Sequence, residues 1–316
     1  MVSINTALGP IDSEKLGFTQ SHEHISGGFG GSPHSFPEFL DRPATLARAV
    51  RDLTQAKIEG LQTIMDVAPH DQGRDVRLQQ EVSRQSGINI VVCTGTWLDV
   101  PRFFERLEPD KIAQMYIREI EEGIDGTGIK PGIIKVASDR DGVKPGEELV
   151  LRAAARASLH TGIPIMTHTW APARIGDQQV QILEEEGMDL SKVCIGHSND
   201  TTNMEYLTGL LQKGVWLGMD RHPGNGPDVP NWKERTQILK TLINQGWGKR
   251  IMIAHDWDSS MGLFPSEMRS ARENNNPDNY LFIIRNVIPY MREIGVKDTD
   301  INTITIDNPR RYLEYA

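Results

Sequence analysis

The chain has 316 residues, of which 38% are hydrophobic and 24% are charged, and its formal net charge is −9. The acidic balance, with no cluster of Lys or Arg to reverse it locally, argues against nucleic acid as a partner. No apolar run approaches the ~18 residues that a membrane span requires, and the N-terminus has no signal-peptide pattern. We therefore expect a soluble cytoplasmic protein with no membrane partner.

Short apolar or β-branched runs alternate with segments of helical periodicity along the chain, which is typical of a parallel sheet with helical crossovers. Strands are predicted at residues 16–21, 61–67, 88–95, 132–137, 163–167, 192–196, 215–219 and 250–254. Helices are predicted at residues 44–59, 109–123, 147–161, 174–186, 203–213 and 232–245, with a closing helix near 279–294.

The number of predicted strands decides the architecture. A doubly wound sheet usually stops at about five to seven strands, whereas a barrel closes at about eight. We therefore predict a TIM (β/α)8 barrel, with residues 1–316 as a single domain. The long polar stretch at residues 258–277, after the eighth strand, is predicted to be an active-site loop or lid. Cys93 and Cys194 lie in apolar runs and are expected to be reduced core residues.

Candidate metal ligands stand at the ends of four predicted strands. The first strand runs into His22 and His24, which point to the same side because side chains alternate along a strand. The fifth, sixth and eighth strands end at His168, His197 and Asp256. Barrel enzymes assemble their sites at the C-terminal strand ends, and these side chains suit divalent metals. Each residue alone is also compatible with a hydrogen-bonded strand end, but together they predict a metal centre.

Lys135, in the run GIIKVAS, lies where the fourth strand should be buried on both faces. An unpaired ammonium there would be costly. Two interpretations compete: a salt bridge to a barrel carboxylate, or a lysine of depressed pKa that has reacted with carbon dioxide to form a carbamate. From chemistry alone the salt bridge is favoured.

A series of longer motifs extends over nearly the whole chain, in order and at matching strand ends. They are SHEHI (21–25), GRDV (73–76), GTGIKPGIIKVAS (126–138), LVLRAAARASLHTGIPIMTHT (149–169), VCIGHSND (193–200), YLTGLLQKGVWLGMDR (206–221), AHDW (254–257) and DNPRRYL (307–313). With these motifs the sequence resembles the phosphotriesterase family of the amidohydrolase superfamily, which includes phosphotriesterases and phosphotriesterase-like lactonases.

The resemblance implies a binuclear metal centre. It assigns His22, His24 and Asp256 to a buried ion and His168 and His197 to a more exposed one. Lys135, as a carboxylated lysine, would bridge the two ions together with a hydroxide. The resemblance thus reverses the preference for a salt bridge at Lys135. Zinc is the favoured metal, and cobalt, manganese or iron are compatible with the same mixed nitrogen and oxygen ligands.

The same resemblance implies catalytic roles. Asp256 would hold the hydroxide and take its proton, and Asp200 would continue a proton relay. The alternative for Asp200 is a helix N-cap ahead of the run TTNMEYL.

Two positions bear on the substrate and point in opposite directions. Arg221 is typical of the lactonase branch, whereas Trp97 resembles phosphotriesterases, in which a Trp lines the leaving-group pocket. Packing at a strand end for Trp97 and a surface ion pair for Arg221 are the alternatives. Trp257 is also expected to shape the substrate pocket.

We therefore predict an ester-bond hydrolase that acts on a lactone or carboxylic ester, with promiscuous phosphotriesterase activity. Phosphotriesterase as the principal activity is the alternative. Mononuclear deamination is disfavoured because that site class lacks a bridging Lys, and a non-catalytic binding protein is disfavoured because all ligand types are retained. The expected partner is a small-molecule ester, lactone or organophosphate. A homodimer is an expectation from the family alone.

Overall fold

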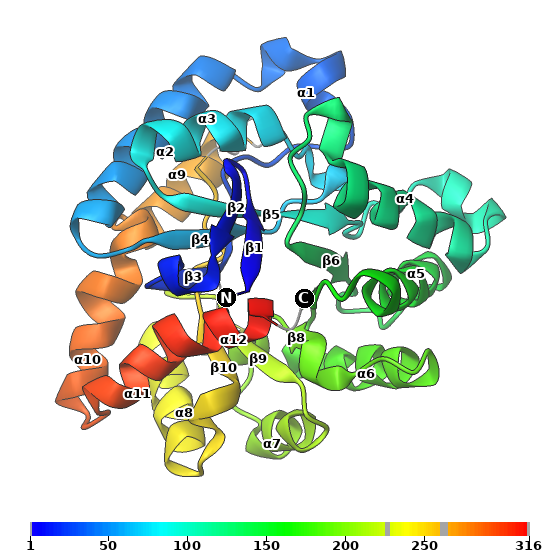
Figure 1. The fold of residues 1–316 in the computed structure, drawn as a ribbon. Coiled ribbons are helices and arrows are strands. Elements are labelled where there is room, and N and C mark those ends of the chain that lie inside the picture. The colour runs from blue at the N-terminus through cyan, green and yellow to red at the C-terminus, as the bar shows by residue number, and fades with distance from the viewer. Residues whose placement is uncertain (1, 225–227, 260–264, 315–316) are drawn as a thin grey trace.

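The computed structural model describes residues 2–224, 228–259 and 265–314 (Figure 1). Its main feature is a sheet of parallel strands that follow one another in chain order. The strands are β3 (Thr19–Glu23), β4 (Thr63–Asp66), β5 (Asn89–Gly95), β6 (Ile133–Ala137), β7 (Ile165–His168), β8 (Val193–Ile195), β9 (Trp216–Met219) and β10 (Ile251–Ile253). Each overlaps a strand predicted from the sequence, and the barrel fold is confirmed.

Helices surround the sheet as an outer ring (Figure 1). Those that follow the first seven strands are α2 (Arg42–Ile58), α3 (Val76–Ser86), α4 (Pro109–Glu122), α5 (Pro145–Thr161), α6 (Ile175–Glu185), α7 (Met204–Gln212) and α8 (Trp232–Asn244). All except α3 were predicted. The chain also forms α1 (Ser32–Ser35) and, at its end, α10 (Ile288–Glu293), α11 (Asp298–Asn302) and α12 (Asn308–Glu314). Among the described helices, none is long and apolar enough to cross a membrane.

The first and last strands meet at a seam that individual hydrogen bonds close. The Asp256 amide donates to the His22 carbonyl at 3.0 Å, and the His24 amide donates to the Trp257 carbonyl at 2.7 Å. His24 and Asp258 form an isolated parallel bridge at the same place. Residues more than 230 positions apart in the sequence, such as His24 and Asp256, therefore lie side by side at one end of the barrel.

The N-terminal end of the barrel is closed by apolar packing. A hairpin that was not predicted, β1 (Ser3–Thr6) with β2 (Gly9–Asp12), lies across this end together with α12, and both termini are near it (Figure 1). Ile4 from the hairpin and Tyr312 from α12 pack with the inward side chains of the strands, including Cys93 and Cys194. Both cysteines are buried and free, as expected. The open end of the barrel is therefore the opposite, C-terminal one.

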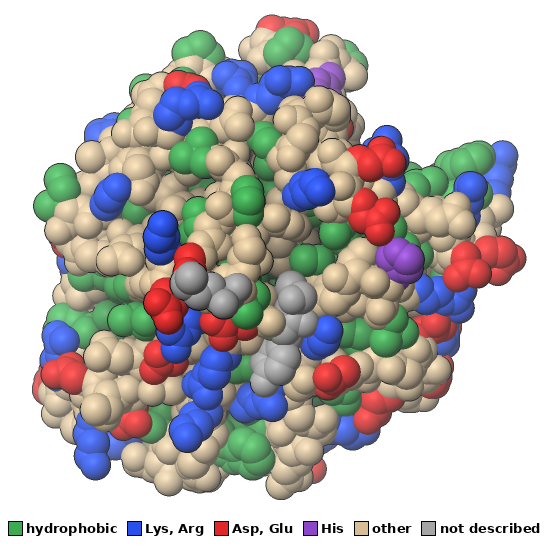
Figure 2. Space-filling model, viewed as in Figure 1, with side chains coloured by type: hydrophobic (Ala, Val, Ile, Leu, Met, Phe, Trp, Pro, Cys, Tyr) green, Lys and Arg blue, Asp and Glu red, His purple; other side chains and the backbone are tan. Residues whose placement is uncertain are grey.

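The predicted loop at residues 258–277 is only partly a loop. Residues 266–275 form the helix α9 (Ser266–Asn275), which has no buried residue, and residues 260–264 lie outside the described part of the chain. Acidic and basic side chains are interspersed over the face seen in Figure 2. That face has no broad patch of a single charge.

Candidate metal centre and active site

A cavity of about 210 Å³ opens at the C-terminal strand ends, where the sequence placed the site. Polar and charged side chains dominate its wall. They include His22, His24, Trp97, Lys135, His168, Arg221, Asp256 and Arg272. The structure therefore gathers most of the predicted site residues into one concave surface.

His22, His24 and Asp256 form a compact group of possible metal ligands. The His24 Nε2 atom lies 3.1 Å from Asp256 Oδ1, and the His22 Nε2 atom lies 3.6 Å from the same oxygen. Asp256 has a φ of 57°, in the left-handed region that non-glycine residues rarely adopt, and this turn aims its carboxylate back into the barrel. Burial acts to raise the pKa of Asp256, but His197 and Arg221 hold it well below its ordinary value.

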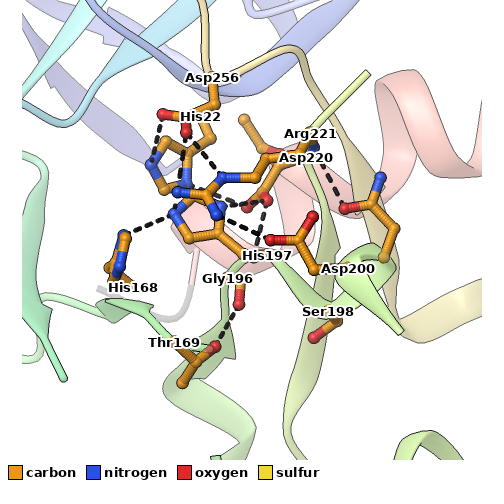
Figure 3. Close-up of polar contacts among 12 residues, drawn as sticks. His22, His168, Thr169, Gly196, His197, Ser198, Asp200, Asp220, Arg221 and Asp256 are labelled. Atoms are coloured by element: carbon orange, nitrogen blue, oxygen red, sulfur yellow. Dashed lines mark hydrogen bonds and ion pairs between the residues drawn. The ribbon is translucent and has the colours of Figure 1, made fainter. Parts of the chain in front are cut away.

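His168 and His197 form a second pair. The His168 Nδ1 and His197 Nε2 atoms are 2.8 Å apart, and their rings are nearly perpendicular (Figure 3). Burial lowers the pKa of His168 to about 4 and that of His197 well below its ordinary value. Burial likewise lowers the pKa of His22. These imidazoles are therefore neutral at pH 7, which is the form that binds a metal ion.

Lys135 lies between these groups on β6, and its side chain is 1% exposed. Its Nζ lies 2.9 Å from the His22 Nε2 atom, and it forms no ion pair with any described carboxylate. The salt bridge weighed from the sequence is therefore absent. Burial lowers the pKa of Lys135 to about 8, so a sizeable fraction of this amine is neutral near physiological pH.

Asp220 is a site residue that the sequence analysis missed. Its carboxylate is fully buried after β9 and contacts the Nδ1 atoms of both His22 and His197, at 3.0 and 2.9 Å. It also accepts from the His197 amide at 2.7 Å. Burial and the charge of Asp256 raise the pKa of Asp220, and the bond from the His197 amide opposes that shift.

The contacts of Asp220 fix the roles of the ring nitrogens. When Asp220 is ionised it only accepts, so both Nδ1 atoms carry the proton and the Nε2 lone pairs point toward Lys135 and His168. His22, His197 and Asp220 are also spaced like a metal site. We interpret this group as support for the ligands, because the two Nδ1 atoms already have the carboxylate as their partner.

Arg221 connects the candidate ligands to Asp200. Its Nε donates to Asp256 Oδ2 at 2.9 Å and its Nη1 donates to Asp200 Oδ2 at 2.7 Å (Figure 3). Asp200 Oδ1 accepts from Arg235 at 2.8 Å. With a side chain only 21% exposed, Arg221 is not a surface ion pair. Asp200 is not a helix cap either, because the N-cap of α7 is Asn203.

With this geometry in view, comparison with known proteins decides the family. Residues 2–313 match the model of the phosphotriesterase family. The chain belongs to the phosphotriesterase family.

Several relatives and a solved structure are similar to this phosphotriesterase-family chain over most of its length. The phosphotriesterase homology protein of Mycobacterium tuberculosis is 39% identical and covers 99% of this chain and 98% of its own. The aryldialkylphosphatase of Saccharolobus solfataricus is 34% identical, covering 96% of both chains. The N-acetyltaurine hydrolase of Dictyostelium discoideum is 31% identical over 84% of this chain and 72% of its own. The solved phosphotriesterase structure from Mycobacterium tuberculosis has a TM-score of 0.92 at 37% identity, over 99% and 98% of the two chains. Together these findings support a hydrolase.

Two tryptophans of this phosphotriesterase-family chain differ in position. Trp97 lines the cavity, with its ring 5.7 Å from the His168 ring, and its amide donates to the Asp71 carboxylate at 2.8 Å. Trp257 is 5% exposed, packs in an apolar cluster and is not among the cavity-lining residues. Trp257 was expected to shape the pocket, but its side chain packs with the apolar cluster instead of lining this cavity. Arg272 of α9 lies over the Trp257 ring and lines the cavity instead.

Proposed function

We propose that this protein is a metal-dependent hydrolase of ester bonds whose main substrate is a lactone or carboxylic ester. The observation that carries the proposal is the convergence of His22, His24, Asp256 and the pair His168 and His197 near buried Lys135, where all of them except His197 line one cavity. Phosphotriesters are proposed as side substrates that use the same residues.

The donor set fits two divalent ions. His22, His24 and Asp256 would hold one ion, and His168 and His197 the other, with zinc favoured and cobalt, manganese or iron compatible. The fit rests on three neutral imidazoles and on the 2.8 Å approach of the His168 and His197 nitrogens, which brings two ligand atoms together. When bound, the ions would act as Lewis acids toward a carbonyl or phosphoryl oxygen and lower the pKa of water.

Lys135 is proposed to be carboxylated. Its neutral amine would attack the carbon of carbon dioxide, forming an N–C bond and releasing one proton, so that the product is a carbamate anion. The carbamate would supply oxygen ligands to both ions. The lowered pKa of Lys135 and its lack of a carboxylate partner among the described residues support this assignment.

Asp256 is proposed as the base that takes the proton of the attacking water. The relay from Asp256 to Asp200 suggested by the resemblance has an obstacle, because the Arg221 guanidinium lies between the two carboxylates. A guanidinium stays protonated and cannot pass a proton on. We therefore assign Asp200 the role of positioning Arg221.

Arg221 also lines the cavity, where it can donate to a substrate carbonyl oxygen as negative charge develops on it. This favours a lactone or ester over a bulky phosphotriester, which needs apolar room for its substituents. Phosphotriesterase as the main activity is the second candidate. Trp97 in the cavity wall and the aryldialkylphosphatase relative favour it.

A substrate panel tests the proposal. Purified chain is loaded with zinc, and kcat/KM is measured for lactones, carboxylic esters, N-acyl amides and phosphotriesters, with metal content determined in parallel. We expect two ions per chain and the highest kcat/KM among lactones or esters. Phosphotriester turnover near the ~10⁸ M⁻¹s⁻¹ diffusional ceiling without lactone or ester turnover would favour the second candidate. Active protein with one ion per chain would exclude the binuclear site.

A further inference from the structure

Arg272 is a cationic residue of the cavity wall that the proposed chemistry does not use. It projects from α9 and its Nη2 donates to the Asp256 carbonyl oxygen. Its guanidinium carbon lies 5.5 Å from the centre of the Trp257 ring, so the group is held between a backbone oxygen and an aromatic face. The guanidinium is therefore fixed next to the backbone of a candidate ligand.

The partners of Arg272 differ from those of the other cavity arginine. Arg221 contacts two carboxylates, those of Asp200 and Asp256. Arg272 forms no ion pair within residues 2–224, 228–259 and 265–314, and its Nε is buried without a hydrogen-bond partner there. A guanidinium has five N–H donors, and only one hydrogen bond from that of Arg272, which is partly exposed at the cavity wall, goes to a described protein group. An anionic group of a ligand would supply the negative charge and the hydrogen-bond acceptors that the described protein groups do not.

Helix α9 is anchored on both sides, which holds Arg272 in place. Glu273 Oε1 accepts from Arg48 Nη1 of α2 at 2.5 Å. Asn275 Nδ2 donates to the Gly224 carbonyl, beyond β9, at 2.7 Å. Residues on either side of the barrel seam thus fix the helix that carries the guanidinium. A pre-positioned guanidinium loses little freedom when it binds a carboxylate.

We propose that Arg272 is a specificity-determining residue that binds a terminal oxyanion of the substrate. The main substrate is then a small lactone or ester that carries a carboxylate or phosphate group away from the bond that is cleaved. This inference rests on the proposed hydrolase function and narrows its substrate class. Arg221 would donate to the oxygen of the reacting carbonyl, and Arg272 would bind the anionic group of the same substrate molecule.

Matched substrates test the assignment on the zinc-loaded chain. They are a five-membered lactone with a ring carboxylate, the same lactone with a carboxamide, and the same lactone with a phosphate ester. We expect kcat/KM for the anionic lactones to exceed that for the carboxamide by about tenfold or more, since charge-assisted hydrogen bonds are the strong ones. The carboxylate and phosphate arms show which oxyanion is preferred.

Three variants assign any preference to its residue. Arg272→Gln should abolish the preference by raising KM for the anionic lactones more than KM for the carboxamide, so that the ratio of the two kcat/KM values falls to about one. Arg272→Lys, which keeps the positive charge, should retain part of the preference for anionic lactones. Arg269→Gln removes a positive charge from α9 outside the cavity wall. It should change neither the preference for anionic lactones nor the turnover of the carboxamide lactone. Equal rates for charged and neutral lactones in wild type, or a preference that survives Arg272→Gln, would overturn the inference.

A binding measurement separates this inference from the proposed function. Pyroglutamate is the lactam analogue of the carboxylate lactone, and its affinity is compared with that of pyroglutamide by calorimetry. We expect wild type to bind the anion more tightly and Arg272→Gln to bind both equally, with metal content unchanged. Turnover of the carboxamide lactone without anion preference contradicts only the role of Arg272. Anion-selective binding without any lactone turnover contradicts only the proposed function.

Discussion

The Asp220 carboxylate contacts the His22 Nδ1 atom at 3.0 Å and so presents the opposite nitrogen of that ring to Lys135 and the cavity. The same carboxylate orients His197, which belongs to the other proposed ion. One buried residue therefore orients ligands of both ions.

Replacing Asp220 should weaken both ion sites. In Asp220→Asn the amide group offers one acceptor and one donor, so one imidazole must change its tautomer and protonate the nitrogen that faces the cavity. We expect about 10- to 100-fold weaker zinc affinity, measured by competition with a chelator. The control is Asp110→Asn, which removes an exposed carboxylate that pairs with Arg156. Unchanged zinc affinity in Asp220→Asn would contradict the orienting role.

Lys135 should control metal loading. Reconstitution of metal-free protein with zinc is expected to be faster with added bicarbonate and, at equal concentrations of dissolved carbon dioxide, faster at pH 8.5 than at pH 6.5. The reason is that the neutral amine, which forms above the pKa of about 8, is the reactive species.

Variants of Lys135 extend this prediction. Lys135→Ala should lose metal and activity together, and short carboxylic acids should restore part of both by supplying oxygen ligands. Lys213→Ala, which removes an exposed partner of Glu184, should load normally. A rate of metal loading that does not depend on bicarbonate would argue for an unmodified amine. So would a mass of the intact loaded protein that lacks the increment of one carbon dioxide.

Arg221 and Asp200 should differ in their kinetic effects. Arg221→Gln is expected to slow lactone hydrolysis more than phosphotriester hydrolysis, by about 1–3 kcal/mol in ΔΔG‡. Asp200→Asn should cost less, because Arg221 keeps its bond to Asp256. If Asp200 only positions Arg221, the solvent isotope effect on kcat stays at the wild-type value in Asp200→Asn. A marked change in that isotope effect would instead restore Asp200 to a proton relay.

His222 should make folding sensitive to acid. It is buried, and burial lowers its pKa to about 3. The unfolded chain therefore binds a proton at this residue between about pH 6.5 and pH 3, whereas the folded chain does not. Stability that is present above pH 6.5 is lost as the pH falls through this window. In urea titrations from pH 7 to pH 4, His222→Gln should lose less unfolding free energy than wild type, and equal losses would contradict this assignment.

The sequence predicted the barrel, and it placed the candidate ligands at one end of that barrel, because both inferences depend on local patterns. Strands alternate with helices, and each ligand directly follows an apolar run, so its place at the C-terminal end of the barrel follows from chain direction alone. The direction of the Trp257 side chain could not be predicted in this way, because Trp257 lies beyond the end of β10 and follows Asp256, whose φ is 57°. Helix α3 was also detectable, since Asp75 caps it by accepting from the Leu78 amide at 2.9 Å.

Other features have no local signal. Helix α9 buries none of its residues, so it lacks the apolar stripe from which a helix is recognised. Asp220 follows its strand as the ligands do, but its partners His22 and His197 are 198 and 23 residues away. The position of Arg221 between Asp200 and Asp256 likewise depends on tertiary contacts.

The seam between β3 and β10 places the ligands of one proposed ion at the ends of the earliest and the latest strands of the barrel. During synthesis on the ribosome, His22 and His24 emerge long before Asp256. No nascent chain shorter than about four-fifths of the protein can complete this coordination shell. Metal binding would therefore stabilise only the complete barrel. It would hold the first and last strands together once both have been synthesised.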